Sequence, residues 1–158
     1  MDIGKSIKLK MKGDEHVVIK KYLSENSLVE SNLTSFNNFV DKKMQEIVDE
    51  ISANITNEDD LEIKLGKIRI DKPNIIESDG STSKLAPAEA RLRNLTYSSP
   101  IFLEITTKQD GQNESQEVEI GRIPVMVKSK VCNLCGASPE ELLAEYMDPL
   151  DPGGYFIV

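Results

Sequence analysis

Residues 97–129 decide the fold, and they read YSSPIFLEITTK (97–108), QDGQNES (109–115) and QEVEIGRIPVMVKS (116–129). Apolar and polar residues alternate in the first and third segments, which predicts two strands that each bury one face. The middle segment is rich in Gly, Asn, Asp and Ser, so it predicts the loop of an antiparallel hairpin. LEIKLGKIRI (61–70) alternates in the same way, with a slip of register expected at Gly66. These strands predict a largely antiparallel sheet.

Helical spacing appears on both sides of these strands. It begins at His16, and a longer helix follows between Leu33 and Ile51, with Ser31 or Asn32 expected as its N-cap. Short helices are predicted at 86–95 and 138–146, each with a proline in its first turn, and Ser138 is the expected N-cap of the second. Helices and strands do not alternate as βαβ units. The predicted fold class is therefore α+β, with N-terminal helices packed on a mixed, largely antiparallel sheet.

The two ends of the chain differ from its middle. Residues 1–13 mix Lys, Gly and Ser without a period, so we expect a flexible N-terminus. The last residues, GYFIV (154–158), read as the beginning of an apolar strand. Since a domain rarely ends on an unfinished core element, we expect residues 14–158 to form an incomplete domain, truncated at its C-terminus.

Composition favours an acidic domain without a membrane span. The 158 residues have a formal net charge of −8, only 5% aromatic residues and no Trp. A free-standing nucleic-acid-binding domain is usually basic, and a single-strand platform needs aromatic rings. No apolar run approaches the roughly 18 residues of a membrane helix, and the N-terminus lacks an apolar signal region. We therefore expect a cytoplasmic chain with reduced cysteines.

No residue set predicts catalysis or a complete metal site. His16 is the only histidine, and neither phosphate-binding glycine motif is present. The loop around Asp79 lacks the spacing of a calcium-binding EF-hand. CNLC (132–135) contains two thiols, which is half of a tetrahedral zinc site or the core of a redox motif. A plain loop with two reduced thiols is the third reading. We expect no cofactor and no metal in this segment.

Positive charge gathers in one turn, EARLRNL (89–95). Arg91 and Arg93 lie about 200° apart on a helix, so they cannot face one ligand. Arg91 borders the apolar stripe and is the predicted structural residue, in an ion pair with Glu104, with Asp79 as a further possible partner. Arg93 is the predicted nucleic-acid contact, and Lys128 and Lys130 after the hairpin are two more. Internal ion pairing of both arginines, with Glu89 or Glu104, remains an equal alternative.

Five blocks in one order carry a family resemblance. They are LTSFNNFVDKKMQEIV (33–48), KIRIDKP (67–73), ESDGSTSKLAPAEARLRNLTYSSPIF (77–102), EIGRIPVMVKSKVCNL (119–134) and DPGGYFIV (151–158). Together they resemble the second-largest subunit of multisubunit DNA-dependent RNA polymerase, most closely the archaeal B type. The resemblance covers about residues 15–158. The second cysteine of CNLC departs from the family pattern, so the resemblance implies no zinc there.

The resemblance implies a role without local chemistry. In that family this region begins the protrusion domain, part of one wall of the DNA cleft, and takes part in transcription within a nucleotidyltransferase complex. Catalytic residues and Mg²⁺ are then expected elsewhere in the polymerase. The implied partners are the other subunits, including the largest, the DNA template and a basal initiation factor, but no membrane. A free-standing acidic protein-interaction module and a small zinc or redox protein are the alternatives.

Overall fold

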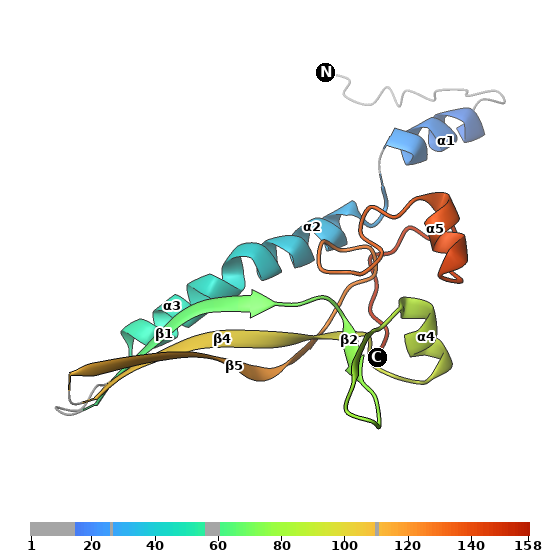
Figure 1. Cartoon of the computed structure of the whole chain (residues 1–158). Helices are drawn as coiled ribbons and strands as arrows, with labels where there is room; N and C mark the ends of the chain where they lie inside the picture. Colours follow the sequence, from blue (N-terminus) through green and yellow to red (C-terminus); the bar gives the residue numbers. More distant parts are fainter. Residues whose placement is uncertain (1–14, 26, 56–60, 110) are drawn as a thin grey trace, which may run out of the picture.

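A three-stranded antiparallel sheet forms the long arm of the molecule (Figure 1). The computed structural model describes residues 15–25, 27–55, 61–109 and 111–158, so the expected flexible N-terminus lies outside the described residues. The strands are β1 (Leu61–Ile70), β4 (Ser98–Gln109) and β5 (Gln112–Pro124), in the order β1-β4-β5. The predicted hairpin and sheet are confirmed. The predicted fold class, α+β, is confirmed as well.

The hairpin is tighter than the sequence predicts. Pairing of β4 with β5 continues to Gln109 opposite Gln112, so most of the expected loop at 109–115 is strand. Both faces of the hairpin are solvated in this stretch, so polar residues can occupy the strands without being buried. At the other end β5 stops at Pro124, whereas the sequence predicts strand to 129.

The two faces of the sheet differ in polarity. On one face Leu65 lies opposite Ile105, and Ile68 lies opposite Leu103. On the other face Arg69 pairs with Phe102, and Glu117 pairs with Glu104. This alternation follows from the period of two along a strand. One face is therefore apolar and the other is charged.

A bulge interrupts β1 where the slip was expected. The register with β4 shifts between Leu65 and Ile68, at Gly66. A Cβ atom on Gly66 would lie 2.7 Å from the Oε2 of Glu104, so the carboxylate occupies the space that a side chain would need. A second shift lies between Ile101 and Phe102 of β4, where β5 contains an extra residue.

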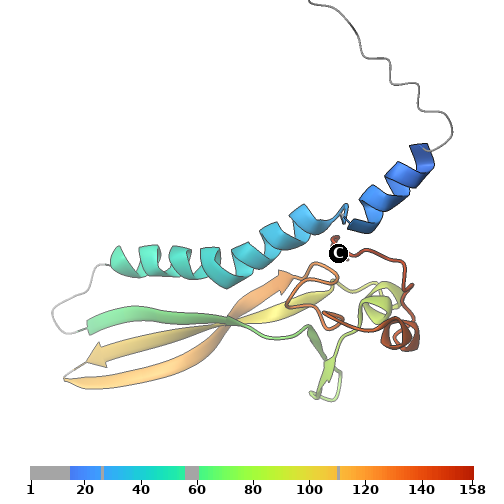
Figure 2. The ribbon, with the colours of Figure 1, turned by 90° about the horizontal axis from the view of Figure 1, so that it is seen from above.

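One continuous helix runs along β1 (Figures 1 and 2). It consists of α2 (Glu30–Asn38), a five-residue π-helical turn η1 (Phe39–Lys43) and α3 (Met44–Ala53). The predicted caps are wrong, because the helix begins at Glu30 after Val29 and neither Ser31 nor Asn32 precedes it. The π turn inserts an extra residue and so changes which side chains face the sheet. Phe36, Met44 and Val48 are the buried ones.

Side chains of α3 bind the free edge of β1. Gln45 accepts a hydrogen bond from the backbone N–H of Ile68 at 3.0 Å and donates one to the carbonyl of Gly66 at 3.1 Å. Ser52 accepts one from the N–H of Leu65 at 3.0 Å. These bonds satisfy backbone groups that the bulge and the edge leave without a strand partner. The helix therefore covers the edge strand.

The globular end contains the main core. It includes β2 (Asn74–Ile76), β3 (Thr82–Lys84), α4 (Pro87–Leu92) and α5 (Pro139–Ala144). Ser138 and Glu141 form the expected capping box of α5. The buried cluster consists of Leu85, Ala90, Tyr97, Val125, Val127, Cys132, Leu134, Leu142 and Met147. This core joins segments that are far apart in the sequence.

The C-terminal segment is only half covered. Tyr97 donates its N–H to the carbonyl of Ile157 and Val127 donates to that of Tyr155, each at 2.9 Å. Tyr155 and Ile157 pack on the core, whereas Phe156 and Val158 are exposed. The expected strand start is therefore a hydrogen-bonded extended segment rather than a regular strand.

The first helix, α1 (Glu15–Glu25), confirms the helical spacing that begins at His16. Its side chains Val17, Val18, Ile19 and Tyr22 are all more than half exposed. Among the described residues, none of the helices has the length and apolar character to cross a membrane.

Replacing Gln45 tests the edge contact. Gln45→Ala should lower the free energy of unfolding by about 1 to 2 kcal/mol, because two part-buried backbone groups of the bulge lose their partner. Urea unfolding measures the change. Gln116→Ala, an exposed glutamine of β5, is the matched control and should stay within about 0.5 kcal/mol of the unaltered chain. Equal effects of the two substitutions would show that the edge contact contributes nothing.

Candidate functional site: the basic turn and its neighbours

Arg93 at the end of α4 is held by two carboxylates. Its Nη1 donates to Glu77 at 3.0 Å and to Glu89 at 2.8 Å, and its Nη2 donates to the second oxygen of Glu77 at 3.1 Å. Glu89 is one helical turn back, and Glu77 precedes the β2–β3 loop. The hydrogen bond from Arg93 lowers the pKa of the Glu77 carboxyl, and both glutamates raise the pKa of Arg93. The sequence leaves two alternatives for Arg93, a nucleic-acid contact and an internal ion pair. The structure shows an internal ion pair, with Glu89 among the partners.

Arg91 faces the C-terminal segment. Its Nη2 donates to the hydroxyl of Tyr155 and lies 4.0 Å from Asp151, and its guanidinium is 5.3 Å from the centre of the Tyr155 ring. Tyr155 donates in turn to Asp151, which also accepts from the N–H of Gly153 at 2.8 Å. Burial raises the pKa of Tyr155 to about 12, helped by Asp151 and opposed by Arg91. This cluster fastens the last residues to α4.

The structure does not bring Arg91 and Glu104 together. Glu104 lies on the charged face of the sheet, where it accepts from Ser115 at 3.1 Å. Asp79 accepts from the N–H of Ser81 at 2.8 Å within its own loop. The carboxylate paired with Arg91 is instead Asp151, which belongs to the C-terminal segment that packs beside α4. The predicted structural role of Arg91 thus has a different partner.

Lys128 and Lys130 also have partners within the chain. The Nζ of Lys128 donates to the carbonyl of Asp151. The Nζ of Lys130 binds both oxygens of Asp41, at 2.7 and 2.9 Å, and its side chain is still 64% exposed. Asp41 belongs to the π turn, so this ion pair joins the helix to the loop after β5. The three predicted nucleic-acid contacts lie in different places and do not form one cluster.

Arg69 was missed by sequence reasoning. It forms a fork with Glu117 across the sheet, with both bonds at 2.8 Å, pairs with Asp71, and lies 4.5 Å from the centre of the Phe102 ring. The hydrogen bond from Arg69 lowers the pKa of Glu117. The alternation of Arg69 with Ile68 and Ile70 is a signal for the polar face, but nothing in the sequence identifies the opposing glutamate.

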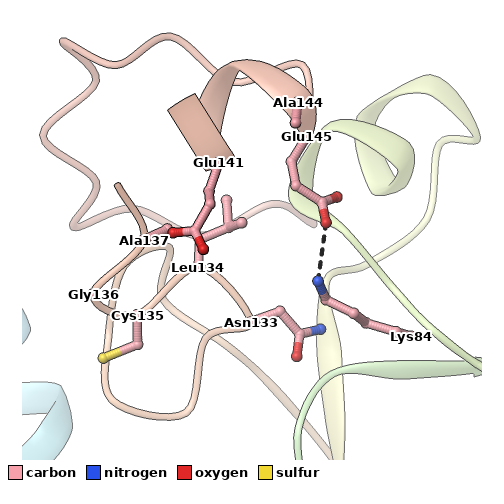
Figure 3. A pocket seen from close by; sticks show the side chains of 9 residues that line it. All are labelled: Lys84, Asn133, Leu134, Cys135, Gly136, Ala137, Glu141, Ala144 and Glu145. Carbon is pink, nitrogen blue, oxygen red and sulfur yellow. Dashed lines mark hydrogen bonds and ion pairs between the residues drawn. The ribbon is translucent and has the colours of Figure 1, made fainter. Parts of the chain in front are cut away.

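The two thiols of CNLC have different environments. Cys132 is fully buried, and its sulfur lies 3.4 Å from the hydroxyl of Tyr97. Cys135 is exposed and lines a pocket of about 380 Å³ beside the ion pair of Lys84 and Glu145 (Figure 3). Its sulfur points away from that pair. One thiol therefore belongs to the core and the other to the surface.

In the described ranges, no three His, Cys, Asp or Glu side chains are grouped so that they could hold a metal ion. The site consists of matched opposite charges: Arg93 with Glu77 and Glu89, Lys130 with Asp41, and Lys84 with Glu145. Such pairs fix loops in place, and their exposed members can exchange a carboxylate for another anion.

Comparison with known proteins gives one consistent family. Residues 27–158 match the family described as RNA polymerase beta subunit. The chain is 42% identical over 150 residues to DNA-directed RNA polymerase subunit Rpo2N of Methanothermobacter thermautotrophicus, covering 94% of this chain and 29% of the relative. It is 43% identical over 149 residues to Rpo2N of Methanocaldococcus jannaschii, covering 89% of this chain and 30% of that relative.

A longer relative extends this result. The chain is 44% identical over 142 residues to DNA-directed RNA polymerase subunit Rpo2 of Saccharolobus solfataricus, covering 89% of this chain and 13% of the relative. The chain thus spans less than a third of the length of each of these relatives.

Removing one hydroxyl tests the C-terminal cluster. Tyr155→Phe should lower the free energy of unfolding by about 1 kcal/mol, because Arg91 and Asp151 lose the group that bridges them. Tyr146→Phe removes the hydroxyl of a tyrosine that is 92% exposed, and it is the control for the loss of a hydroxyl. Urea unfolding of both variants at neutral pH gives the comparison. If Tyr155→Phe is as stable as Tyr146→Phe, the bridge does not fasten the segment.

Alkaline pH should weaken the same cluster. Because the pKa of Tyr155 is about 12 in the folded chain against an ordinary value of 10.0, its contribution is complete below pH 10. It is lost as pH rises through about 12, since the unfolded chain gives up this proton first. Unfolding measured from about pH 9 to about pH 12 should show a steeper fall for the unaltered chain than for Tyr155→Phe. Parallel curves would contradict the assignment.

Proposed function

The chain belongs to the RNA polymerase beta subunit family, and from this we propose that it forms part of the wall of the DNA cleft in DNA-directed RNA polymerase. It corresponds to the N-terminal part of the second subunit of the archaeal enzyme, and residues 14–158 form the beginning of the protrusion domain. The observation that carries the proposal is the family match over residues 27–158, which includes the sheet, the long helix and the globular end.

The proposed partners follow from this place in the enzyme. They are the other polymerase subunits, the largest included, the DNA template and a basal initiation factor. The complex works in transcription in the cytoplasm. The chain contributes to a nucleotidyltransferase without carrying out the transfer itself.

The arm is an extended sheet with a long helix along one edge, and this is a suitable shape for part of a cleft wall (Figure 1). The helix covers the edge of β1, one face of the sheet is apolar, and the opposite face carries alternating charges. Its ion pairs include Lys64 and Lys108 with Glu62, and Arg69 with Glu117. A surface of matched charges stays solvated and keeps its shape beside a polyanion, because it offers no excess of positive charge for tight binding.

The chemistry is proposed to lie elsewhere in the enzyme. Nucleotidyl transfer uses two metal ions held by clustered carboxylates. The part of the chain that the structure describes contains no such cluster, so these residues do not fit the Mg²⁺ site. Support and steering of DNA are the functions left to this segment.

Lys130 is the leading phosphate contact among the three candidates. Its side chain is more than half exposed, and a single carboxylate, Asp41, holds it. Arg93 is held by two glutamates, and Lys128 is less exposed than Lys130 and makes a part-buried hydrogen bond, so both rank below Lys130. A phosphate would take the place of Asp41 at the ammonium group of Lys130.

The test compares variants of the assembled polymerase. Lys130→Ala should reduce the slope of log affinity for DNA against log salt by about 1, the loss of one phosphate contact. Asp41→Asn should strengthen DNA retention, because it removes the competing carboxylate. Lys43→Ala is the control, since Lys43 is 55% exposed and is likewise paired with one carboxylate, Glu46. Filter-binding assays over a series of salt concentrations measure the DNA affinity of all three variants.

Two outcomes would contradict the assignment. Identical salt slopes for Lys130→Ala and Lys43→Ala would exclude Lys130 as a specific contact. A larger loss with Arg93→Ala or Lys128→Ala, in enzyme that is fully assembled, would move the contact to that residue.

A further inference from the structure

Arg122 of β5 differs from Arg69 and Arg93 in its hydrogen-bond partners. Its Nη2 donates to the side-chain oxygen of Asn74 at 2.8 Å, to the carbonyl of Asn74 and to the carbonyl of Ser98 at 3.3 Å. Its Nε donates to the hydroxyl of Ser98 at 3.3 Å. All of these acceptors are neutral. Arg69 and Arg93 instead donate to carboxylates at 2.8 to 3.1 Å.

The charge of Arg122 is therefore fixed in place mainly by neutral acceptors. Its Nη1 also forms an ion pair with Glu119, but at 3.9 Å this pair is too long for a hydrogen bond, and Glu119 is 42% exposed. The side chain is only 32% exposed, so water compensates the charge incompletely. A guanidinium that is anchored at one end and has only a long ion pair at the other can exchange that pair for a close, hydrogen-bonded carboxylate.

An apolar hollow lies beside this guanidinium. Arg122 lines it together with Ile75, Ile76, Leu85 and Leu95, and its volume is about 260 Å³. Ile76 is 62% exposed. The hollow is smaller than the roughly 300–1,000 Å³ of sites for drug-sized molecules. Its size and aliphatic walls suit a side chain of a partner protein rather than a free ligand.

We propose that Arg122 and this hollow form a docking site for a segment of a partner protein in which an acidic residue stands next to an aliphatic one. The carboxylate binds Nη1 of Arg122 in place of Glu119, and the aliphatic side chain enters the hollow against Ile75 and Ile76. A nucleic acid fits less well, because its bases stack on aromatic rings and the hollow has none. The proposal does not rest on the function proposed above.

The experiment uses the 158-residue chain with labelled Ile and Leu methyl groups. The probe is the capped peptide Gly-Ser-Leu-Glu-Ile-Ser-Gly, titrated to about 10 mM and followed by NMR. Methyl signals of Ile75, Ile76 and Leu95 should shift. The same peptide with Gln in place of Glu should bind about tenfold more weakly, because a charge-assisted hydrogen bond is lost.

Variants of the chain locate the contact. The Arg122→Gln variant should bind the Glu peptide about tenfold more weakly than the unaltered chain does. It should bind the Gln peptide at least as tightly as the unaltered chain does. Ile76→Ser, at an exposed position, should also weaken binding. Arg69→Gln is the control on the same sheet and should leave binding unchanged. If Arg122→Gln does not fold, the two peptides measured on the unaltered chain still decide the role of the charge.

Three results would overturn the proposal: equal binding of the Glu and Gln peptides, loss of binding in Arg69→Gln, or no methyl shift at the highest peptide concentration. An oligothymidylate that shifts the same methyl groups at lower concentration than the peptide would also overturn it, in favour of a nucleic-acid contact.

Discussion

Tyr97 is the residue on which the union of the sheet and the globular end depends. Its N–H binds the carbonyl of Ile157, its carbonyl accepts from Val125, and its hydroxyl accepts from the N–H of Asn133 and contacts Cys132. Four bonds thus join the beginning of β4 to three distant segments. The side chain is fully buried, and this burial raises the pKa of its hydroxyl, so the neutral form that makes these contacts is the stable one. These bonds attach the base of the arm to the globular end.

The same contact explains why CNLC, the most motif-like stretch of the sequence, has a structural role at the first of its two cysteines. Cys132 packs against the Tyr97 hydroxyl, and Asn133 donates its side-chain amide to the carbonyls of Pro73 and Leu85. Cys132 and Asn133 therefore hold neighbouring loops, and Leu134 is buried in the core. Of the two cysteines, Cys135 is the exposed one. The cysteines of this motif differ in role because one fills the core and the other lies at the surface.

Local patterns predicted most of the elements, whereas long-range partners could not be predicted. Alternation identified β1, β4 and β5, the proline and serine signals identified α4 and α5, and Gly66 marked the bulge. These signals act within a few residues. The partner of Arg91 is Asp151, sixty residues later, and the sequence offers many carboxylates of equal merit. The hairpin tip was misjudged because polar residues that favour loops also occur in a strand solvated on both faces.

The excess of acidic residues decides which positive charges remain available. With 27 acidic against 19 basic side chains, most cations described here find a carboxylate, and the basic turn that stands out in the sequence is largely neutralised in space. A cation is available to a partner when the local geometry gives it neutral acceptors instead. Arg122 meets this condition because its hydrogen-bond acceptors are an amide, a hydroxyl and two backbone carbonyls, and its ion pair with Glu119 is long, at 3.9 Å. Arg93 stands in the more basic stretch of sequence and does not meet it. Local density of basic residues therefore ranks Arg93 above Arg122, whereas the identity of the hydrogen-bond acceptors ranks Arg122 above Arg93.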